Sequence, residues 1–224
     1  MIRREPLEPD LFIYRDTEKP GYTADSIQLI RFADLKKNDR VIDLGSGSGI
    51  LSIYGCYLYD CSFIGVEHDA EQAALALRSA RENGQGIDFY AMDVAETPAF
   101  FGDGTFTAAI CNPPYFTREN PCADVDRNMA RHGEKTQMDS FFASVFRLLK
   151  NKGRLYVCAP AESLSSLCCT LERNRLIPKV LQPVRSKPEK VPYLVLVEAV
   201  KLAGNGLIWK KDICLFSGDE TAAD

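Results

Sequence analysis

The sequence lacks the long apolar runs that carry a protein into or across a membrane. No stretch of its 224 residues approaches the ~18 consecutive apolar residues of a membrane-spanning helix. The first residues, Met1 to Pro6, include charged side chains and no apolar core of the kind found in a secretory signal peptide. These absences predict a cytoplasmic protein with no membrane partner.

Metal-binding and disulfide patterns are missing as well. The chain has only two histidines, His68 and His132, and its eight cysteines include no C-x-x-C pair. Most of the cysteines lie within apolar runs, which predicts buried, reduced thiols. The sequence therefore argues against a zinc site and a disulfide framework. We expect neither a bound metal nor a catalytic histidine.

The net charge of −4 hides an uneven distribution of charged residues. Residues 1–117 contain 10 Lys and Arg against 18 Asp and Glu, whereas residues 118–211 contain 17 against 9. A basic half beside an acidic half is compatible with a polyanion that binds one face of the protein. Ordinary solvated surface charge would give the same count, and the pI near 5.4 argues against unspecific affinity for nucleic acids.

The length and the pattern of apolar segments predict one α/β domain over residues 21–216, with an N-terminal extension over 1–20 and a frayed acidic tail over 217–224. Apolar runs alternate with segments of helical periodicity, which predicts a mostly parallel, seven-stranded sheet with helices on both faces. Only residues 185–192 separate the last two strands, too few for a crossover helix, so these strands are predicted to form an antiparallel hairpin. The predicted strands are 40–44, 62–67, 87–92, 106–111, 153–159, 177–184 and 193–201, with a possible short edge strand at 11–14.

A glycine-rich loop follows the first strand of the domain. Gly45, Gly47 and Gly49 stand at alternate positions before an apolar helix, so the loop can bend tightly and a ligand can approach its backbone. A dinucleotide-binding loop would have the spacing G-x-G-x-x-G. The spacing G-x-G-x-G behind an acid, Asp43, instead favours S-adenosylmethionine, because the acid would repel a pyrophosphate but can accept hydrogen bonds from a zwitterionic amino acid. A tight turn without a ligand is the alternative.

Two further strands end in carboxylates. Glu67 ends the strand 62–67, and Asp93 follows the strand 87–92. The carboxyl ends of an open parallel sheet line one ligand crevice. The spacing between Gly45 and Glu67 is close to the ~20 residues expected for an acid that binds ribose hydroxyls. Asp93 is placed to accept from an adenine amino group.

The stretch Asn112 to Tyr115, with the sequence N-P-P-Y, follows the buried strand 106–111. Its two prolines end the strand and leave carbonyl oxygens that no sheet partner can bind. Asn112 adds one side-chain acceptor and two donors, and Tyr115 adds a flat aromatic face. The set suits a planar group that carries an amino substituent. An Asn-Pro turn that only caps the strand is the alternative.

A long polar segment, residues 116–134, has no apolar period and is predicted to be a loop, functional or disordered. A helix is predicted to follow it over residues 137–150, because the apolar residues of that stretch fall on one helical face.

Together these features resemble the Rossmann-fold S-adenosylmethionine-dependent methyltransferases over nearly the whole chain. The N-P-P-Y stretch is similar to the motif of methyltransferases that modify planar nitrogen. Within that group the sequence resembles the bacterial tRNA adenine-N6 methyltransferases that act on valine tRNA beside the anticodon. The resemblance is carried by Y-T-A-D at 22–25, N-P-P-Y-F at 112–116, A-R-H-G-E at 130–134 and the segment 179–183.

The resemblance implies methylation of the exocyclic amino group of adenine in tRNA, most closely adenosine 37 of valine tRNA, with S-adenosylmethionine as cofactor. The residues to which it gives catalytic roles are Asn112, Pro113, Pro114 and Tyr115. The residues implied for the cofactor are Tyr22, Thr23, Asp43, Gly45, Gly47, Gly49, Glu67, Asp93 and Asn112. The candidates for RNA contacts are Phe116, Arg118, Arg127, Arg131, Lys135, Arg185 and Lys187, although each cation alone is more simply a solvated surface charge.

Other functions stay open at this point. N5-methylation of a glutamine in a protein such as a release factor, or N-methylation of an rRNA base, would use the same motif. A nicotinamide-dependent oxidoreductase would require the other glycine spacing, and a non-catalytic cofactor-binding module would have no use for N-P-P-Y. The sequence leaves the oligomeric state and any requirement for a partner protein undetermined.

Overall fold

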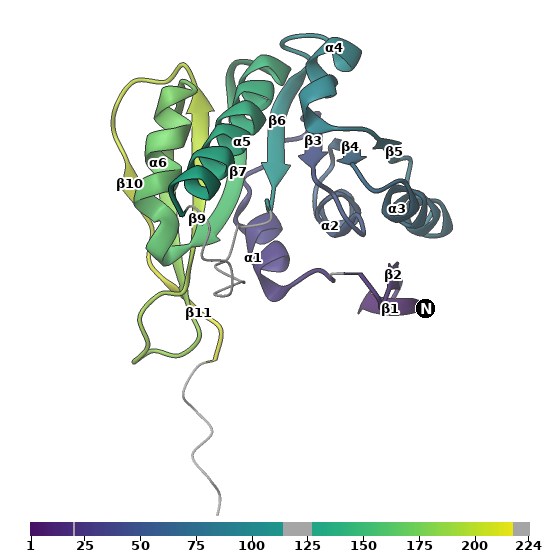
Figure 1. Ribbon diagram of the computed structural model, residues 1–224. Coiled ribbons are helices and arrows are strands. Elements are labelled where there is room, and N and C mark those ends of the chain that lie inside the picture. Colours follow the sequence, from purple (N-terminus) through teal and green to yellow (C-terminus); the bar gives the residue numbers. More distant parts are fainter. Residues whose placement is uncertain (20, 114–126, 217–224) are drawn as a thin grey trace, which may run out of the picture.

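The computed structural model describes residues 1–19, 21–113 and 127–216, and within the last range the side chains from residue 137 onward (Figure 1). A twisted sheet forms the centre, helices cover both of its faces, and a small hairpin lies beside it. The strands of the central sheet are β3 (Arg40–Leu44), β4 (Ser62–Glu67), β5 (Asp88–Ala91), β6 (Phe106–Cys111), β7 (Leu149–Pro160), β8 (Leu176–Arg185), β9 (Leu194–Lys201), β10 (Ile208–Trp209) and β11 (Ile213–Cys214).

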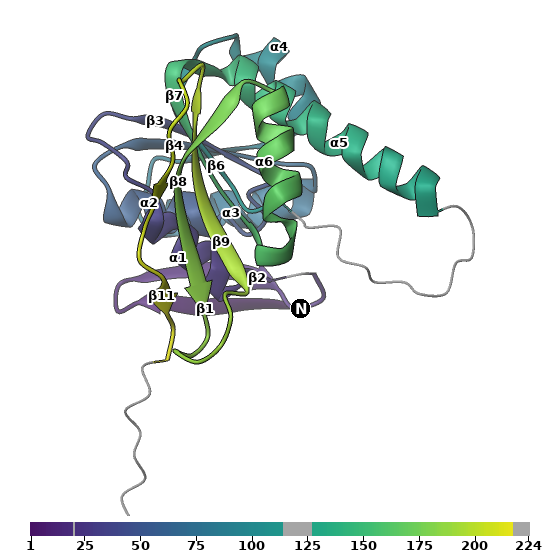
Figure 2. The same ribbon diagram turned by 90° about the vertical axis from the view of Figure 1, so that its left-hand side faces the viewer.

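The strand order is β10-β8-β9-β7-β6-β3-β4-β5, and β11 also pairs with β8. Only β9 is antiparallel to its neighbours among these described strands. The predicted parallel sheet with a terminal antiparallel hairpin is confirmed. The strands β10 and β11 were not predicted, because two residues give no alternation that a pattern can reveal. Figure 2 shows this last segment running along β8 at the outer edge of the sheet.

The helices form one layer on each face of the sheet. Residues of α1, α2 and α3, such as Leu29, Ile53 and Ala76, share one buried cluster, whereas Phe142 of α5 and Leu171 of α6 belong to the other. The helices are α1 (Ala24–Phe32), α2 (Ile50–Leu58), α3 (Ala70–Glu82), α4 (Thr97–Phe101), α5 (Arg127–Leu148) and α6 (Leu164–Arg173), with short 3-10 turns η1 (Val94–Glu96) and η2 (Ala161–Ser163). Within the described ranges, none of the helices has both the length and the apolar character needed to cross a membrane.

Helix α5 corrects the predicted loop over residues 116–134. The helix begins at Arg127, ten residues before the predicted start at 137. It ends at Leu148, and residues 149 and 150, which were predicted to be helical, belong to β7. The stretch from 127 to 136 has no apolar stripe, but its Arg, Ala, Met, Glu and Lys residues are good helix formers. Helix propensity therefore accounts for the greater length of this helix, and Figure 2 shows its N-terminal half projecting from the sheet.

The N-terminal residues form an antiparallel hairpin of β1 (Ile2–Glu8) and β2 (Leu11–Asp16), outside the central sheet. The predicted short strand at 11–14 lies in β2. Leu11 and Ile13 are buried against the α1–α3 side of the core, and the Tyr14 N–H donates to Ser79 Oγ of α3 at 2.8 Å. The hairpin thus adds apolar area and polar contacts to α3.

The expectation of buried thiols is correct for only part of the cysteines. Cys111 and Cys158 are buried, whereas Cys169 and Cys214 are exposed. Cys169 lies within an apolar run but on the solvent side of α6, because a helix of this kind buries only one face.

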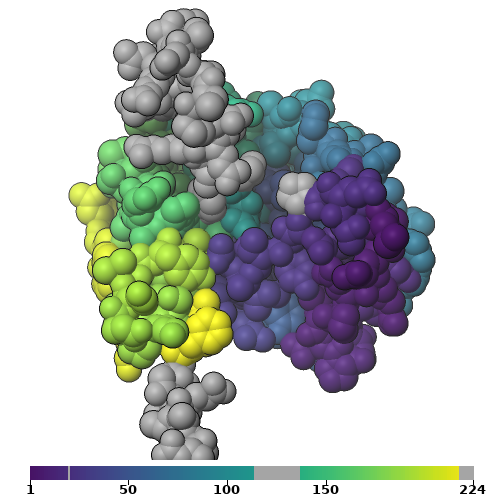
Figure 3. All heavy atoms as spheres, turned by 60° about the horizontal axis from the view of Figure 1, so that its bottom comes forward, coloured from purple at the N-terminus to yellow at the C-terminus, as the bar shows by residue number. Residues whose placement is uncertain are grey.

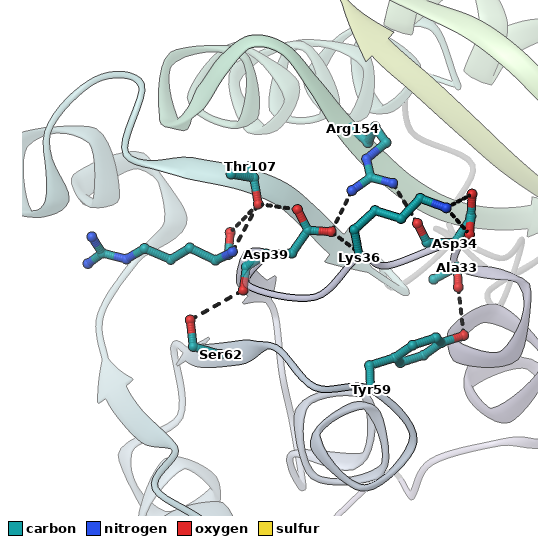
Figure 4. Close-up of polar contacts among 9 residues, drawn as sticks. Ala33, Asp34, Lys36, Asp39, Tyr59, Ser62, Thr107 and Arg154 are labelled. Atoms are coloured by element: carbon teal, nitrogen blue, oxygen red, sulfur yellow. Dashed lines mark hydrogen bonds and ion pairs between the residues drawn. The ribbon is translucent and has the colours of Figure 1, made fainter.

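Asp39 ties together the strands at the amino end of the sheet (Figure 4). Its carboxylate accepts hydrogen bonds from Thr107 Oγ1 at 2.7 Å, from the Lys36 N–H at 2.6 Å and from the Arg154 guanidinium. These donors come from β6, the turn before β3, and β7. Both oxygens of a nearly buried carboxylate are therefore satisfied within the protein.

Candidate active site

The carboxyl ends of β4, β3 and β6 lie side by side at the opposite end of the sheet, because the three strands are parallel neighbours. Glu67 ends β4, the glycine loop follows β3, and Asn112 follows β6. Side chains from distant parts of the chain are thereby brought to one edge, where ligands bind in open α/β sheets.

A cleft of about 370 Å³ opens at this edge. That volume is within the range of small-molecule binding sites. Its walls are the N-terminal end of α1, the glycine loop, the first residues of α2 and the two residues that follow β6. The predicted site residues that line it are Tyr22, Thr23, Gly45, Gly47, Asn112 and Pro113.

The glycines of the loop have two different roles. Gly45, Gly47 and Gly49 have φ angles of 73°, 52° and 80°, a region that favours glycine. A Cβ atom on Gly49 would lie 2.8 Å from the Phe89 ring, so this glycine permits close packing of the loop on the core. A Cβ on Gly45 would meet nothing within 4 Å. The backbone at Gly45 therefore borders open space that a ligand can fill.

Glu67 fixes the glycine loop from the neighbouring strand. One of its carboxylate oxygens accepts from the Gly47 N–H at 2.8 Å, and the other accepts from the Asp69 N–H at 3.0 Å. Each oxygen keeps a second lone pair for a ligand hydroxyl. Asp93 follows β5 at the same edge but is exposed, and it accepts from the Ala95 N–H at 2.8 Å as the cap of η1. Among the predicted cofactor residues, Asp93, Glu67, Asp43 and Gly49 do not line the cleft.

Asp43 is fully buried beneath the loop. Its Oδ2 accepts from both the N–H and the Oγ of Ser52, at 3.2 and 2.8 Å. Its Oδ1 has no partner within the described part of the chain, and neither has the buried Oγ of Ser46, which lines the cleft. Burial raises the pKa of Asp43 to about 7, with a smaller contribution from the charge of Glu67. Buried polar atoms without partners at a cleft are favourable positions for ligand groups.

Asn112 is held by contacts to two other elements. Its Nδ2 donates to Ser26 Oγ of α1 at 3.0 Å, and its Oδ1 accepts from the Cys158 thiol of β7 at 3.2 Å. Ser26 and Cys158 are both buried. These contacts fix the plane of the amide at the cleft wall, beside the buried Pro113.

The start of α1 closes one side of the cleft. Asp25 in its first turn accepts from the Tyr193 hydroxyl at 3.0 Å, which ties this wall to the residue before β9. Tyr22 is partly buried, and this burial raises the pKa of its hydroxyl. This wall of the cleft therefore connects the start of α1 to the hairpin of β8 and β9.

Several residues that line or support the cleft were not predicted from the sequence. Ser46 and Ser48 stand between the loop glycines, and Gln72 faces the loop from α3. The alternation of serine with glycine was a visible signal for the first two. Ser26 and Cys158 gave no signal, because a buried serine or cysteine in an apolar stretch has no distinctive pattern.

Several predicted site residues cannot be placed. Pro114, Tyr115, Phe116 and Arg118 lie outside the described residues, and so do the side chains of Arg127, Arg131 and Lys135 in α5. Arg185 and Lys187 lie at and after the end of β8 and do not line the cleft.

Residues 35–205 match a family model described as a methyltransferase domain. The chain is 27% identical to the tRNA1(Val) (adenine(37)-N6)-methyltransferase of Phocaeicola vulgatus over 188 aligned residues. These residues make up 83% of this chain and 79% of that protein. The chain is 25% identical to the Shewanella woodyi protein of the same name over 206 residues, 88% of this chain and 85% of that one. The crystal structure of a predicted O-methyltransferase from Agrobacterium tumefaciens has the same fold, with a TM-score of 0.72 at 17% identity over 88% of this chain and 90% of that chain.

Proposed function

Because the chain belongs to the methyltransferase-domain family, we propose that it transfers a methyl group from S-adenosylmethionine to the exocyclic amino group of an adenine in tRNA, most specifically adenosine 37 of valine tRNA. The observation that carries the proposal is the position of Asn112 and Pro113 in the same cleft as the glycine loop. A methyl donor and a planar amino group can therefore occupy one hollow.

The residues of the cleft fit S-adenosylmethionine. The open space beside Gly45 admits a ligand to the loop backbone, and the unpartnered Oγ of Ser46 in the cleft wall is an acceptor for its ammonium group. We assign Asp43, buried beneath the loop, to the same ammonium group without a direct contact. The free lone pairs of Glu67 suit two ribose hydroxyls. We assign Tyr22, Thr23, Gly47 and Gly49 to the same cofactor and keep Asp93 as a contact to adenine.

The sulfonium of the bound cofactor supplies an electrophilic methyl group. Asn112 and Pro113 act on the acceptor amine, whose lone pair is delocalised into the adenine ring. Oδ1 of Asn112 has a second lone pair beside the one that accepts from Cys158, and the Pro113 carbonyl is a further acceptor. Hydrogen bonds from the amine to these two oxygens draw its lone pair out of the ring. With the cofactor bound, Asn112 and Pro113 would hold this amine toward the methyl group that the sulfonium would supply, and the amine proton would leave to water.

Positioning supplies most of the expected rate, because holding both reactants in line replaces a bimolecular encounter. We assign Pro114 and Tyr115 to the same motif, with Tyr115 stacking on an adenine that has left its own stack. Phe116 and the cations Arg118, Arg127, Arg131, Lys135, Arg185 and Lys187 are assigned to the RNA. The reaction is placed in the cytoplasm, within a domain of residues 21–216.

Methylation of a glutamine amide in a protein, or of an rRNA base, is the second candidate, because both present a planar amino group to the same acceptors. The names of the two similar proteins and the basic character of residues 118–211 favour tRNA.

Incubation with S-adenosylmethionine carrying a tritiated methyl group, and with separate pools of tRNA, rRNA and protein, tests the proposal. We expect label in the tRNA pool and N6-methyladenosine in its nucleoside digest by mass spectrometry. Label confined to the protein or rRNA pool would overturn the proposal.

A further inference from the structure

A second hollow, of about 470 Å³, lies along the outer edge of the sheet. We call its surroundings the edge patch and define it by Arg185, Trp209, Lys210, Lys211 and Asp212. These residues belong to the end of β8 and to the segment that carries β10 and β11. The active-site cleft and this hollow have no lining residue in common.

The edge patch presents a large aromatic ring to solvent. Trp209 is 61% exposed, although its backbone pairs with Leu181 of β8. Ile208 and Leu207 before it are also exposed, at 63% and 50%. Single exposed apolar residues are ordinary, but three consecutive ones beside a hollow are typical of an interaction surface.

The charges around the ring are positive. Arg185 is paired with Asp212, so these two charges compensate each other. Lys210 and Lys211 are exposed, and within the described residues neither makes an ion pair. The Lys210 ammonium lies 5.1 Å from the centre of the Phe32 ring, which places it toward α1. Two exposed lysines therefore follow the indole in the chain. Lys210 lies within electrostatic reach of Asp34 and Glu198, and Lys211 makes no ion pair with a described residue.

The edge patch is connected to the active-site wall. The Tyr193 N–H donates to the carbonyl of Val184, the residue before Arg185, and the Tyr193 hydroxyl donates to Asp25 of the cleft. The exposed residues Lys187 and Lys190 lie in the turn between. Figure 3 looks at this side of the molecule and shows the yellow-green residues of this turn next to the yellow C-terminal segment. A long polyanion can therefore contact both places.

We propose that the edge patch binds the RNA substrate away from the target nucleotide, with an unpaired base stacked on Trp209 and the adjoining phosphates near Lys210 and Lys211. This inference rests on the proposed function in taking RNA as the substrate. A flat exposed ring flanked by cations matches the two ways in which single-stranded RNA is held, stacking of bases and attraction of the backbone. An acidic peptide would use the cations but would leave the ring without a flat partner.

Trp209 is the only tryptophan of the chain, so its fluorescence reports on the edge patch alone. The full-length protein would be titrated with an RNA hairpin that has the sequence of the valine tRNA anticodon arm. We expect saturable quenching of the emission. Trp209→Ala should weaken binding about tenfold or more, raise KM for the RNA and leave kcat at saturating RNA unchanged, whereas Trp209→Phe should keep most of the affinity.

The lysines are tested by salt dependence. The double variant Lys210→Gln and Lys211→Gln should make the slope of log affinity against log salt shallower by about 2. The matched control replaces two exposed cations, Lys37 and Arg78, which pair with Asp60 and Glu82, and it should leave the slope unchanged. A second control, Phe100→Ala, removes a ring that is 59% exposed in α4.

Unchanged emission at saturating RNA, wild-type affinity of Trp209→Ala, or equal quenching by heparin would overturn the proposal, since heparin has charge but no bases. If Trp209→Ala does not fold, the wild-type titration and the lysine pair still decide. Quenching by RNA without methyl transfer would support the edge patch and reject the proposed function. Methyl transfer to tRNA without quenching would do the reverse.

Discussion

Two aspartates near opposite ends of β3 show how the two ends of the sheet differ. Asp39, before the strand, has both carboxylate oxygens bonded to donors from three parts of the chain. Asp43, within the strand, is more deeply buried, and one of its oxygens has no partner among the described residues. Buried polar groups are normally satisfied. The amino end of the sheet is therefore built for stability, and the carboxyl end leaves its polar groups for a ligand.

The difference has an energetic consequence. A satisfied buried network rigidifies the structure, whereas a buried group without a partner costs free energy until something binds to it. Substitutions at the amino end should therefore lower stability and spare activity. Substitutions at the carboxyl end should lower activity and spare stability.

Asn112→Ala should have the largest effect and tests the carboxyl end. Loss of its Oδ1 removes an acceptor from the reacting amine, and we expect the rate of methyl transfer to fall about a thousandfold or more, as for the removal of a group that stabilises a transition state. Affinity for S-adenosylmethionine should change little, because the glycine loop, Asp43 and Glu67 are intact. Single-turnover methyl transfer and calorimetric titration of the cofactor measure the two quantities. Full activity in this variant would refute the role of Asn112.

Asp39→Ala should be the corresponding experiment at the amino end. It leaves the largely buried Arg154 guanidinium without its carboxylate, and we expect the free energy of unfolding to fall by about 3 kcal/mol. Chemical denaturation measures this change. At a temperature where the variant is folded, kcat and cofactor affinity should equal those of the wild type. A loss of cofactor affinity would show that the two ends are not independent.

Asp43→Asn tests how much the buried carboxylate lowers the free energy of unfolding when it ionises, separately from its role in binding the cofactor. Asp43 has a pKa of about 7 in the folded protein, against 3.8 as the ordinary value. Well below the unfolded value of 3.8 the group is neutral in both states, and its contribution to stability is fully present. As the pH rises toward 7, the unfolded chain ionises while the folded one stays neutral, so this contribution is progressively lost.

Without cofactor, the wild type should therefore lose stability relative to Asp43→Asn as the pH rises from about 4 to about 7, by on the order of 3 kcal/mol. The asparagine keeps one oxygen for the two donors of Ser52. Unfolding curves of both proteins at several pH values measure the difference. Parallel pH profiles would mean that Asp43 is solvated or paired in the free protein.

The contrast between the two ends also explains what the sequence could and could not predict. The glycine spacing, Glu67 and the start of the N-P-P-Y stretch are local patterns, and parallel topology brings them to one edge of the sheet. The fold and one part of the cleft, Gly45, Gly47, Asn112 and Pro113, were therefore predictable from them. The hairpin of β8 and β9 followed from the short connection between two strong strands. In each case a few neighbouring residues contain the information.

Features that depend on distant contacts were not predictable. The extension of α5 to Arg127 is set by propensity without an apolar stripe in the sequence, and the pairing of β10 and β11 with β8 depends on that edge being free. Asp39 was not singled out, because a carboxylate in a turn resembles any surface acid until its partners on β6 and β7 are known. The contacts of Ser26 and Cys158 to Asn112 join residues 86 and 46 positions apart.

Removal of either contact to Asn112 should have the smallest effect on kcat among these variants, and it tests whether the carboxyl end of the sheet serves activity more than stability. Each orients the Asn112 amide by one hydrogen bond, and a single neutral hydrogen bond contributes about 0.5–1.5 kcal/mol. Ser26→Ala and Cys158→Ala should each lower kcat about two- to tenfold, with little change in the KM for cofactor.

Cys158→Ser keeps a donor at this position and should recover most of the rate, which a role in packing alone would not produce. Ser144→Ala is the control, since Ser144 is a buried serine that donates only to a carbonyl of its own helix. If the alanine variants lose stability but keep kcat, the two contacts stabilise the fold and do not orient Asn112 for the reaction. The carboxyl end of the sheet would then contribute to stability as the amino end does, against the contrast between Asp39 and Asp43.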